Sequence, residues 1–235
     1  MSTFQETALL ATAMWLALVA VRFRRSIPFL LLGLVAIGLY AIAAMLFREG
    51  TIAELGLAAP GSWLRTIGLA SVWLGLMLAY SPLADWLASR IIAAPPTLEA
   101  FRAIQQSRGK LAAGIMVAWV LGAFLEELVL RGIVVKSVAS WMTAWTVEPV
   151  AGGTGVCIAA FGAGLIHTYQ GPRAVVIVTQ LSVLFGVLFV VSGYDLWAVV
   201  LCHGLYDTIA FIRFATRRSK YSETGRHGSS PDKKT

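Results

Sequence analysis

Charged residues are scarce in this sequence, and their scarcity decides its broad class. Of the 235 residues, 13% are charged and 58% are hydrophobic, and the mean hydropathy is +0.76. A soluble domain of this length needs more charge to cover its surface. The apolar residues also form long runs, and a helix needs about 20 such residues to cross a bilayer. We therefore expect most of the chain to lie in a membrane, with no separate soluble domain.

Cysteine is almost missing, and the glycine-rich segment lacks the residues of a nucleotide site. The two cysteines, Cys157 and Cys202, both fall in apolar segments, so we interpret them as packing residues. Neither a disulfide framework nor a zinc-finger spacing can be built from them. Gly152, Gly153 and Gly155 are not followed by the Lys-Ser/Thr pair of a phosphate-binding loop, and we expect them to form a flexible start to a span.

The basic residues are placed as in a membrane protein. The N-terminal segment MSTFQE has no basic region and contains Glu6, so we expect the first apolar run to be a retained span, not a cleaved signal peptide. The net charge is +7, but the basic residues flank the apolar runs and fill the C-terminal segment. This distribution indicates a lipid bilayer as partner and argues against nucleic acid.

The apolar runs predict an all-α fold, a polytopic membrane helix bundle of about seven transmembrane helices with a site inside the bundle. The predicted spans are 8–21, 28–47, 66–88, 111–136, 153–171, 174–192 and 196–213.

The remaining segments complete a three-part organisation. Residues 1–110 comprise N-terminal membrane helices, an interfacial loop at 48–65, and a polar loop at 89–110 with an amphipathic helix on the membrane surface. Residues 111–213 form the helix bundle that carries the polar motifs. Residues 214–235 are polar and basic, and predict a disordered tail.

Most of the 19 Lys and Arg residues fall on one side of a seven-span topology. By the positive-inside rule, we expect the 89–110 loop and the C-terminus in the cytoplasm, and the N-terminus outside.

Three charged residues lie within six positions of the fourth span: Glu126, Glu127 and Arg131. A charge at mid-membrane costs roughly 2.5–3.5 kcal/mol on insertion scales. Glu127 and Arg131 are spaced i, i+4 and can form an ion pair, a purely structural role. Glu126 lies about 100° around the helix and has no local partner. It must be protonated, or must meet a polar group from another helix.

Polar residues also occur in the fifth and seventh spans. His167 lies in the apolar sequence IAAFGAGLIHTYQG, where a single histidine can be a hydrogen-bonded packing residue. His203 and Asp207 are spaced i, i+4, so the carboxylate can orient the imidazole, or both can face a common oxygen or metal. His227 lies in the C-terminal segment without such a context. Because these polar groups can satisfy one another, we expect spans four, five and seven to touch.

The motifs resemble those of the CAAX-protease and bacteriocin-processing (CPBP) intramembrane proteases, a group that includes the type II prenyl-protein endopeptidases. The family pattern is EExxxR, then FxxxH, then Hxxx followed by Asn or Asp. Here it corresponds to Glu126-Glu127 with Arg131, to His167, and to His203 with Asp207. The resemblance covers about residues 111–211 and implies a multi-pass protein of the bacterial inner membrane.

The resemblance implies a catalytic role for four residues. Glu126 and His167 would hold and activate a water molecule, with the glutamate as general base. His203, with help from Asp207, would stabilise the tetrahedral oxyanion.

Glu127 and Arg131 would hold the geometry of the fourth span. Two positions depart from the family pattern. Ala163 stands where the family has an aromatic residue, and the nearest phenylalanine, Phe161, points to another face. Asp207 stands where many relatives have Asn, whose amide donates a hydrogen bond that an ionised carboxylate does not. Asp207 is therefore protonated, orients His203 or binds a metal.

Several alternatives stay open at this stage. A divalent metal such as zinc is acceptable by ligand type, although the HExxH motif is absent, and we favour the metal-free scheme. The substrate would be a membrane-embedded or lipidated peptide, of which a prenylated CAAX tail is one case. The rival functions are a non-catalytic membrane scaffold or immunity-type protein, and a proton-coupled transporter.

Overall fold

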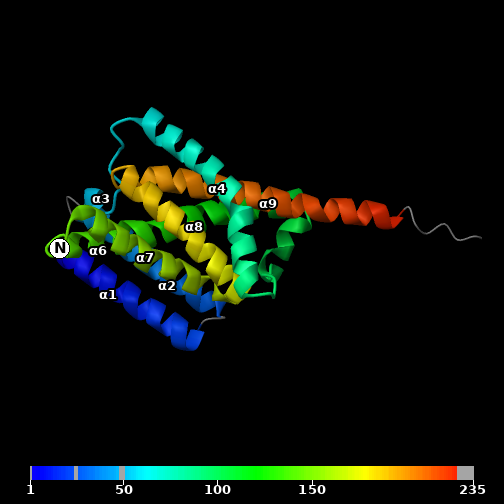
Figure 1. Cartoon of the computed structure of the whole chain (residues 1–235), viewed down its shortest axis with the longest axis horizontal. Helices are drawn as coiled ribbons and strands as arrows, with labels where there is room; N and C mark the ends of the chain where they lie inside the picture. The colour runs from blue at the N-terminus through cyan, green and yellow to red at the C-terminus, as the bar shows by residue number, and fades with distance from the viewer. Residues whose placement is uncertain (1, 24–25, 48–50, 227–235) are drawn as a thin grey trace, which may run out of the picture.

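A computed structural model describes residues 2–23, 26–47 and 51–226 of the chain. These residues form helices and no strand, as the sequence predicted (Figure 1). Seven of the described helices are long and apolar enough to cross a membrane. They are Phe4–Arg22, Ile27–Phe47, Trp63–Ile91, Arg108–Met142, Glu148–Ile166, Pro172–Val191 and Leu196–Thr216. The expected all-α membrane bundle is confirmed, and each expected span overlaps one of these helices.

The helices follow one another with short connections. In chain order they are α1 (Thr3–Leu18) with its π-helical extension η1 (Val19–Phe23), α2 (Ile27–Phe47), the short α3 (Thr51–Glu54), α4 (Trp63–Ile91), the 3-10 helix η2 (Glu99–Gln105), the composite fourth span, α7 (Glu148–Ile166), the 3-10 turn η5 (Thr168–Gln170), α8 (Pro172–Val191) and α9 (Leu196–Arg226).

Local sequence signals explain where several helices begin. Ser2, Ser62 and Ser107 are N-caps whose hydroxyls accept hydrogen bonds from backbone N–H groups of the first turn. A proline in the first turn starts α7 and α8, where the missing N–H has no cost.

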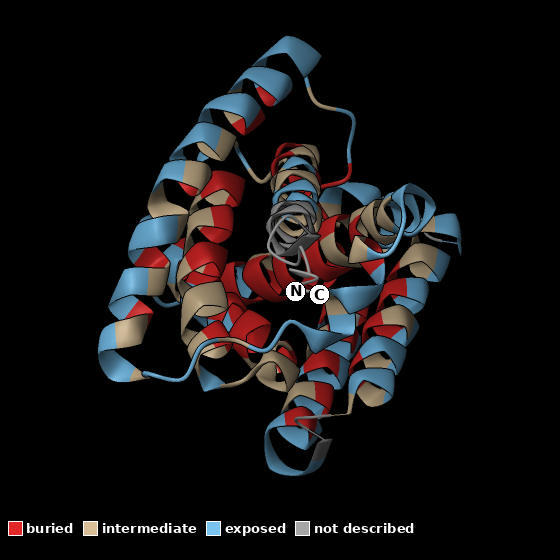
Figure 2. Ribbon diagram, turned by 90° about the vertical axis from the view of Figure 1, so that its right-hand side faces the viewer, coloured by how far each residue is buried: buried red, intermediate tan, exposed pale blue. Residues whose placement is uncertain are grey.

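The fourth span lies at the centre of the packing. It contacts α7 on one side and α9 on the other, and it is also covered by α1 and α2. Helix α8 packs along α7, and α4 packs along both α8 and α9. Figure 2 shows buried residues where the helices face one another and exposed residues on their outward faces. The fourth span therefore meets both the fifth and the seventh, as expected from the polar motifs, whereas the expected packing of the fifth span on the seventh is not found among the described helices.

Gly155, near the start of the fifth span, has a packing role. A Cβ at Gly155 would lie 2.8 Å from the carbonyl oxygen of Val135, so only glycine allows α7 to approach the fourth span this closely. Gly152, Gly153 and Gly155 all lie within α7, which begins at Glu148. The predicted flexible start is therefore wrong, because close helix packing and a regular backbone fix this segment.

The polar loop and the C-terminal segment differ from their predicted form. The polar loop contains the 3-10 helix η2 instead of an amphipathic α-helix, and the following α5 (Arg108–Val117) begins the fourth span directly. Helix α9 continues to Arg226, into the segment predicted as a disordered tail. Helical hydrogen bonds are local, and the chain has no proline between Pro172 and Pro231. The rest of the predicted tail, with His227, lies outside the described residues.

The two cysteines are free thiols. Cys202 is buried and Cys157 is exposed on the outer side of α7. Their predicted role as packing residues fits Cys202, whereas Cys157 faces outward.

Candidate active site

The fourth span changes its helical type around the two glutamates. It consists of α5, the π-helical segments η3 (Ala118–Glu126) and η4 (Leu128–Val135), and α6 (Lys136–Met142). Glu126 ends η3, and Glu127 joins the two π-helical segments. π-Helical turns are rare and occur frequently at functional sites. The wider turns were not predicted, because the sequence pattern was interpreted with the α-helical period.

The predicted ion pair between Glu127 and Arg131 is present and deeply buried. Arg131 Nη1 lies 3.0 Å from Glu127 Oε2, and the two side chains are 1% and 0% exposed. Arg131 Nη2 also donates hydrogen bonds to the carbonyl and hydroxyl oxygens of Ser182 on α8, at 2.8 and 2.6 Å. The guanidinium lies over the ring of Phe185, 5.7 Å from its centroid. Arg131 therefore links the fourth span to α8.

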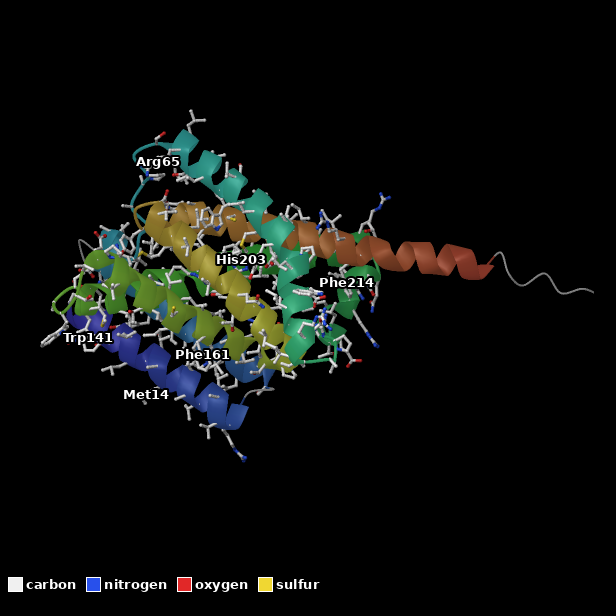
Figure 3. All side chains as sticks on the ribbon, in the orientation of Figure 1. Met14, Arg65, Trp141, Phe161, His203 and Phe214 are labelled. Atoms are coloured by element: carbon white, nitrogen blue, oxygen red, sulfur yellow. The ribbon has the colours of Figure 1, made fainter. Side chains whose placement is uncertain are left out.

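Glu127 has a second partner that the sequence did not reveal. Its Oε1 lies 2.6 Å from His203 Nδ1, across 76 positions of the chain. His203 Nε2 lies 3.5 Å from Asp207 Oδ2, which confirms the predicted i, i+4 pair. The ring of Phe185 stacks on His203 with centroids 4.6 Å apart. His203 is labelled near the middle of the bundle in the view of Figure 3, and its side chain is 12% exposed.

His167 lies at the end of a span instead of inside one. Helix α7 ends at Ile166, and His167 is its C-cap with φ −97° and ψ 9°. The predicted span 153–171 is therefore wrong at its end, because the backbone leaves the α-helix before the histidine. His167 Nδ1 donates to the carbonyl oxygen of Ala163 at 2.9 Å, which leaves Nε2 for other partners.

The contact of His167 with α7 does not depend on an aromatic side chain at position 163. The contact to His167 uses the backbone of Ala163, and its small side chain is buried in the helix packing. Phe161 is 62% exposed and lies on another face of α7, as the sequence indicated.

The four candidate catalytic residues line one cavity of about 530 Å³. Glu126, His167, His203 and Asp207 contribute its polar wall, together with Tyr169. The apolar wall comes from α1, α2, η2, the fourth span and α9, and includes Trp15, Leu34, Phe101, Leu121 and Phe211. Such a combination of an apolar wall and a few convergent polar groups is typical of a ligand site.

Gly122 opens the space beside the polar wall. It lies four residues before Glu126 and lines the same cavity. A Cβ at this position would lie 3.2 Å from Asp207 Oδ2 and 3.9 Å from His203 Nε2. The absence of a side chain therefore leaves room for a ligand next to both groups.

Glu126 is buried without a hydrogen-bond or ion-pair partner among the described residues. Its side chain is 8% exposed, and no described residue forms a hydrogen bond or ion pair with it. The neighbouring cation, Arg131, is engaged by Glu127 and Ser182. Glu126 thus faces the cavity with both carboxylate oxygens free of protein partners in the described part of the chain.

The metal alternative lacks a ligand cluster in this arrangement. In the described segments, no three His, Cys, Asp or Glu side chains lie close enough together to hold a metal ion. Zinc sites in proteins use three or four such ligands. We therefore keep the metal-free scheme favoured above, and no step below uses a metal ion.

The part of the sequence that carries the site matches a known protein family. Residues 108–209 match the family model described as type II CAAX prenyl endopeptidase Rce1-like. Over this segment the chain is similar to the Rce1-like family. The match confirms the predicted resemblance, and the Rce1-like segment contains every candidate residue named above. No curated protein and no solved structure matches the chain in the corresponding searches.

Sequence reasoning missed the residues that support the Rce1-like motifs from α8. Ser182 and Phe185 hold Arg131 and His203, yet α8 bears no charged residue near them. The one available signal was the polar sequence TQLS inside a strongly apolar span, since a polar group in a membrane helix needs a partner.

Proposed function

We propose that this protein is an intramembrane endopeptidase that hydrolyses a peptide bond in a membrane-embedded or lipidated protein substrate. The observation that carries the proposal is that Glu126, His167, His203 and Asp207 line one cavity inside the helix bundle. The Rce1-like match supports a membrane protease of the CAAX type.

In the proposed mechanism, Glu126 is the general base. It takes a proton from a water molecule that His167 Nε2 helps to orient, and the water oxygen attacks the carbonyl carbon of the scissile bond. The carbonyl π electrons move to the oxygen, which becomes an oxyanion. When the tetrahedral intermediate collapses, the C–N bond breaks and the leaving amine takes the proton from Glu126.

His203 is the proposed oxyanion donor. Both of its ring nitrogens face carboxylates, Glu127 at Nδ1 and Asp207 at Nε2, and carboxylates accept hydrogen bonds. Nδ1 is committed to Glu127 at 2.6 Å, whereas Nε2 lies 3.5 Å from Asp207 in a residue that lines the cavity, so the Nε2–H group is the donor that can stabilise developing negative charge. The His203 ring is held by Glu127, which is buried and pairs with Arg131, and Arg131 in turn binds Ser182.

The proposed substrate class follows from the position of the cavity. A site within the bundle with an apolar wall is reached by chains that lie in the membrane or carry a lipid. A prenylated CAAX tail is one such substrate, and another membrane-anchored peptide is the alternative.

The two rival functions make different demands on Glu126. A scaffold would pair it with a cation, but Arg131 is engaged elsewhere. A proton relay would use the polar groups in series along a path across the membrane. Their placement around one cavity favours hydrolysis over transport.

The test is cleavage by the full chain reconstituted in vesicles, with a prenylated CAAX peptide and an unprenylated membrane-anchored peptide as quenched fluorescent substrates. Glu126→Gln should abolish cleavage and leave the unfolding temperature unchanged, because it removes the base and keeps the shape. The matched control is Glu99→Gln, an exposed glutamate of η2, which should cleave at the wild-type rate. Equal activity of wild type and Glu126→Gln on every peptide would contradict the protease proposal.

A further inference from the structure

Tyr169 lies in the candidate active site, outside the three motif patterns given above. The chain turns sharply after His167, through η5 and Gly171 at φ 96°, and this turn places Tyr169 beside the histidine. The two rings stack with centroids 6.0 Å apart and an interplanar angle of 26°. Tyr169 also lines the cavity with Glu126 and Asp207.

The Tyr169 hydroxyl is held by Gln170, which lines the same cavity. Gln170 Nε2 donates a hydrogen bond to the Tyr169 hydroxyl oxygen at 2.8 Å. The backbone of Gln170 is anchored in turn, because its carbonyl accepts from Thr97 N–H at 2.9 Å and its N–H donates to the His167 carbonyl at 2.9 Å. The phenol is therefore held in place by a segment with its own hydrogen bonds.

The hydroxyl of Tyr169 differs from those of two other tyrosines in the bundle. Tyr80 donates to Gln180 Oε1 at 2.9 Å, and Tyr206 donates to Ser81 Oγ at 2.9 Å. The Tyr169 oxygen accepts a hydrogen bond instead, and its proton has no acceptor among the residues that the structure describes. A half-buried hydroxyl with an available proton beside the polar groups of the cavity is a donor without a protein partner.

The surroundings keep this proton on the oxygen. Burial raises the pKa of Tyr169, and the negative charges of Glu126 and Asp207 raise it further, against the opposing effect of the Gln170 hydrogen bond. The phenol therefore remains a neutral donor at physiological pH.

The proposed mechanism names one oxyanion donor among the motif residues, His203, and a second donor in the cavity would complement it. Asp207 stands where many relatives have Asn, and an ionised carboxylate cannot supply the hydrogen bond that an Asn amide gives to an oxyanion. With Asp207 directed at His203, one donor of the oxyanion site is missing from the motif residues.

We propose that Tyr169 is a catalytic hydrogen-bond donor that stabilises the oxyanion of the tetrahedral intermediate and replaces the amide that Asp207 lacks. The inference rests on the proposed protease function. The Tyr169 proton is shared with the oxyanion and returns fully to the phenol when the intermediate collapses, so no net proton transfer involves this residue.

The first experiment measures kcat and KM of the reconstituted full chain and of Tyr169→Phe on the cleaved peptide. Loss of one oxyanion donor lowers kcat by about 100-fold or more, and KM should stay within about two-fold, because the donor acts on the intermediate. The control is Tyr206→Phe, which removes a hydroxyl that donates to Ser81 outside the cavity and should change kcat less than about three-fold. A wild-type kcat for Tyr169→Phe would overturn the proposal.

A rescue experiment separates a donor role from a structural one. Asp207→Asn in the Tyr169→Phe background supplies an amide donor and should raise kcat by about ten-fold over Tyr169→Phe alone. If Tyr169→Phe instead damaged the fold, a new donor at position 207 would not restore kcat. No increase over Tyr169→Phe alone would overturn the compensation between the two residues.

A binding experiment keeps this inference distinct from the protease proposal. The probe is a lipidated peptide phosphinate, whose tetrahedral phosphorus carries an anionic oxygen, and the readout is its Kd for the full chain. Tyr169→Phe should weaken binding by about ten-fold, and Tyr206→Phe should not. A wild type that binds the phosphinate through Tyr169 but cleaves no peptide would refute the protease proposal alone, whereas equal Kd values for wild type and Tyr169→Phe would refute the role of Tyr169.

Discussion

Glu127 and His203 are 76 positions apart in the sequence, and their side chains meet at 2.6 Å inside the bundle. Glu127 also pairs with Arg131, so one fully buried carboxylate holds both a cation and a histidine. The second glutamate of the motif therefore connects the packing of the helices to the orientation of the proposed oxyanion donor.

The first prediction concerns this connection. Glu127→Gln removes the charge that compensates buried Arg131 and weakens the contact to His203. Breaking a buried pair on one side costs about 3–5 kcal/mol, so the free energy of unfolding should fall by this order and activity should fall with it. Denaturant unfolding in detergent and the peptide assay measure the two effects.

The matched control is Arg102→Gln, which breaks the exposed pair between Arg102 and Glu99 at 3.2 Å. An exposed pair contributes about 0–1 kcal/mol, so this variant should unfold like wild type. If Glu127→Gln were as stable as Arg102→Gln, the buried ion pair would have no structural importance.

The second prediction concerns Asp207 alone. Asp207→Asn should keep or raise the peptidase activity, because the amide adds a donor to the oxyanion site. A chelator should leave the wild type active, since the proposed mechanism uses a glutamate-activated water. A chelator-sensitive wild type together with an inactive Asp207→Asn, partly restored by excess metal, would replace the metal-free scheme with a metal-dependent one.

The third prediction uses the open space at Gly122. Gly122→Leu should fill the cavity beside Asp207 and His203, and should lower kcat/KM by at least about ten-fold with little change in unfolding temperature. The control is Gly75→Leu in the third span, where a Cβ meets no atom within 4 Å and the residue is exposed. Equal kcat/KM for the two variants would show that substrate does not pass beside Gly122.

The fourth prediction tests the packing of α7 on the fourth span. Gly155→Ala places a Cβ within 2.8 Å of the Val135 carbonyl oxygen, a backbone atom that cannot move away alone. Overpacking of this kind costs about 1–3 kcal/mol of stability.

Gly153→Ala provides the comparison two residues away. Gly153 is exposed, and a Cβ there meets no atom within 4 Å. Alanine is the better helix former by about 0.5–1 kcal/mol, so Gly153→Ala should be neutral or stabilising. If both variants were destabilised by the same amount, backbone flexibility and not the close contact with Val135 would explain why glycine occupies these positions.

Features set by residues close together in the sequence could be predicted, whereas contacts between residues far apart in the sequence could not. The seven spans and the pairs Glu127–Arg131 and His203–Asp207 could be predicted, because hydropathy and i, i+4 spacing are local properties. The contacts of Glu127 with His203 and of Arg131 with Ser182 could not, because nothing in a single sequence states which helix faces lie together.

The end of the fifth span was missed for a related reason. The apolar run continues past His167, so hydropathy predicts a helix to residue 171, whereas the backbone turns at His167 and Gly171 adopts a positive φ. Tyr169 gains its position in the cavity from this turn, and composition alone gives no sign of it.

The π-helical fourth span has a consequence for how the chain can vary. In a regular transmembrane helix, one inserted or deleted residue rotates everything beyond it by about 100° and would turn a catalytic side chain toward lipid. Each hydrogen bond of a π-helix spans one more residue than a hydrogen bond of an α-helix. An inserted or deleted residue in η3 or η4 can therefore be accommodated by a local switch between the two helical types. The helix that bears Glu126 is therefore a place where a single inserted or deleted residue can be accommodated with the same groups still presented to the cavity.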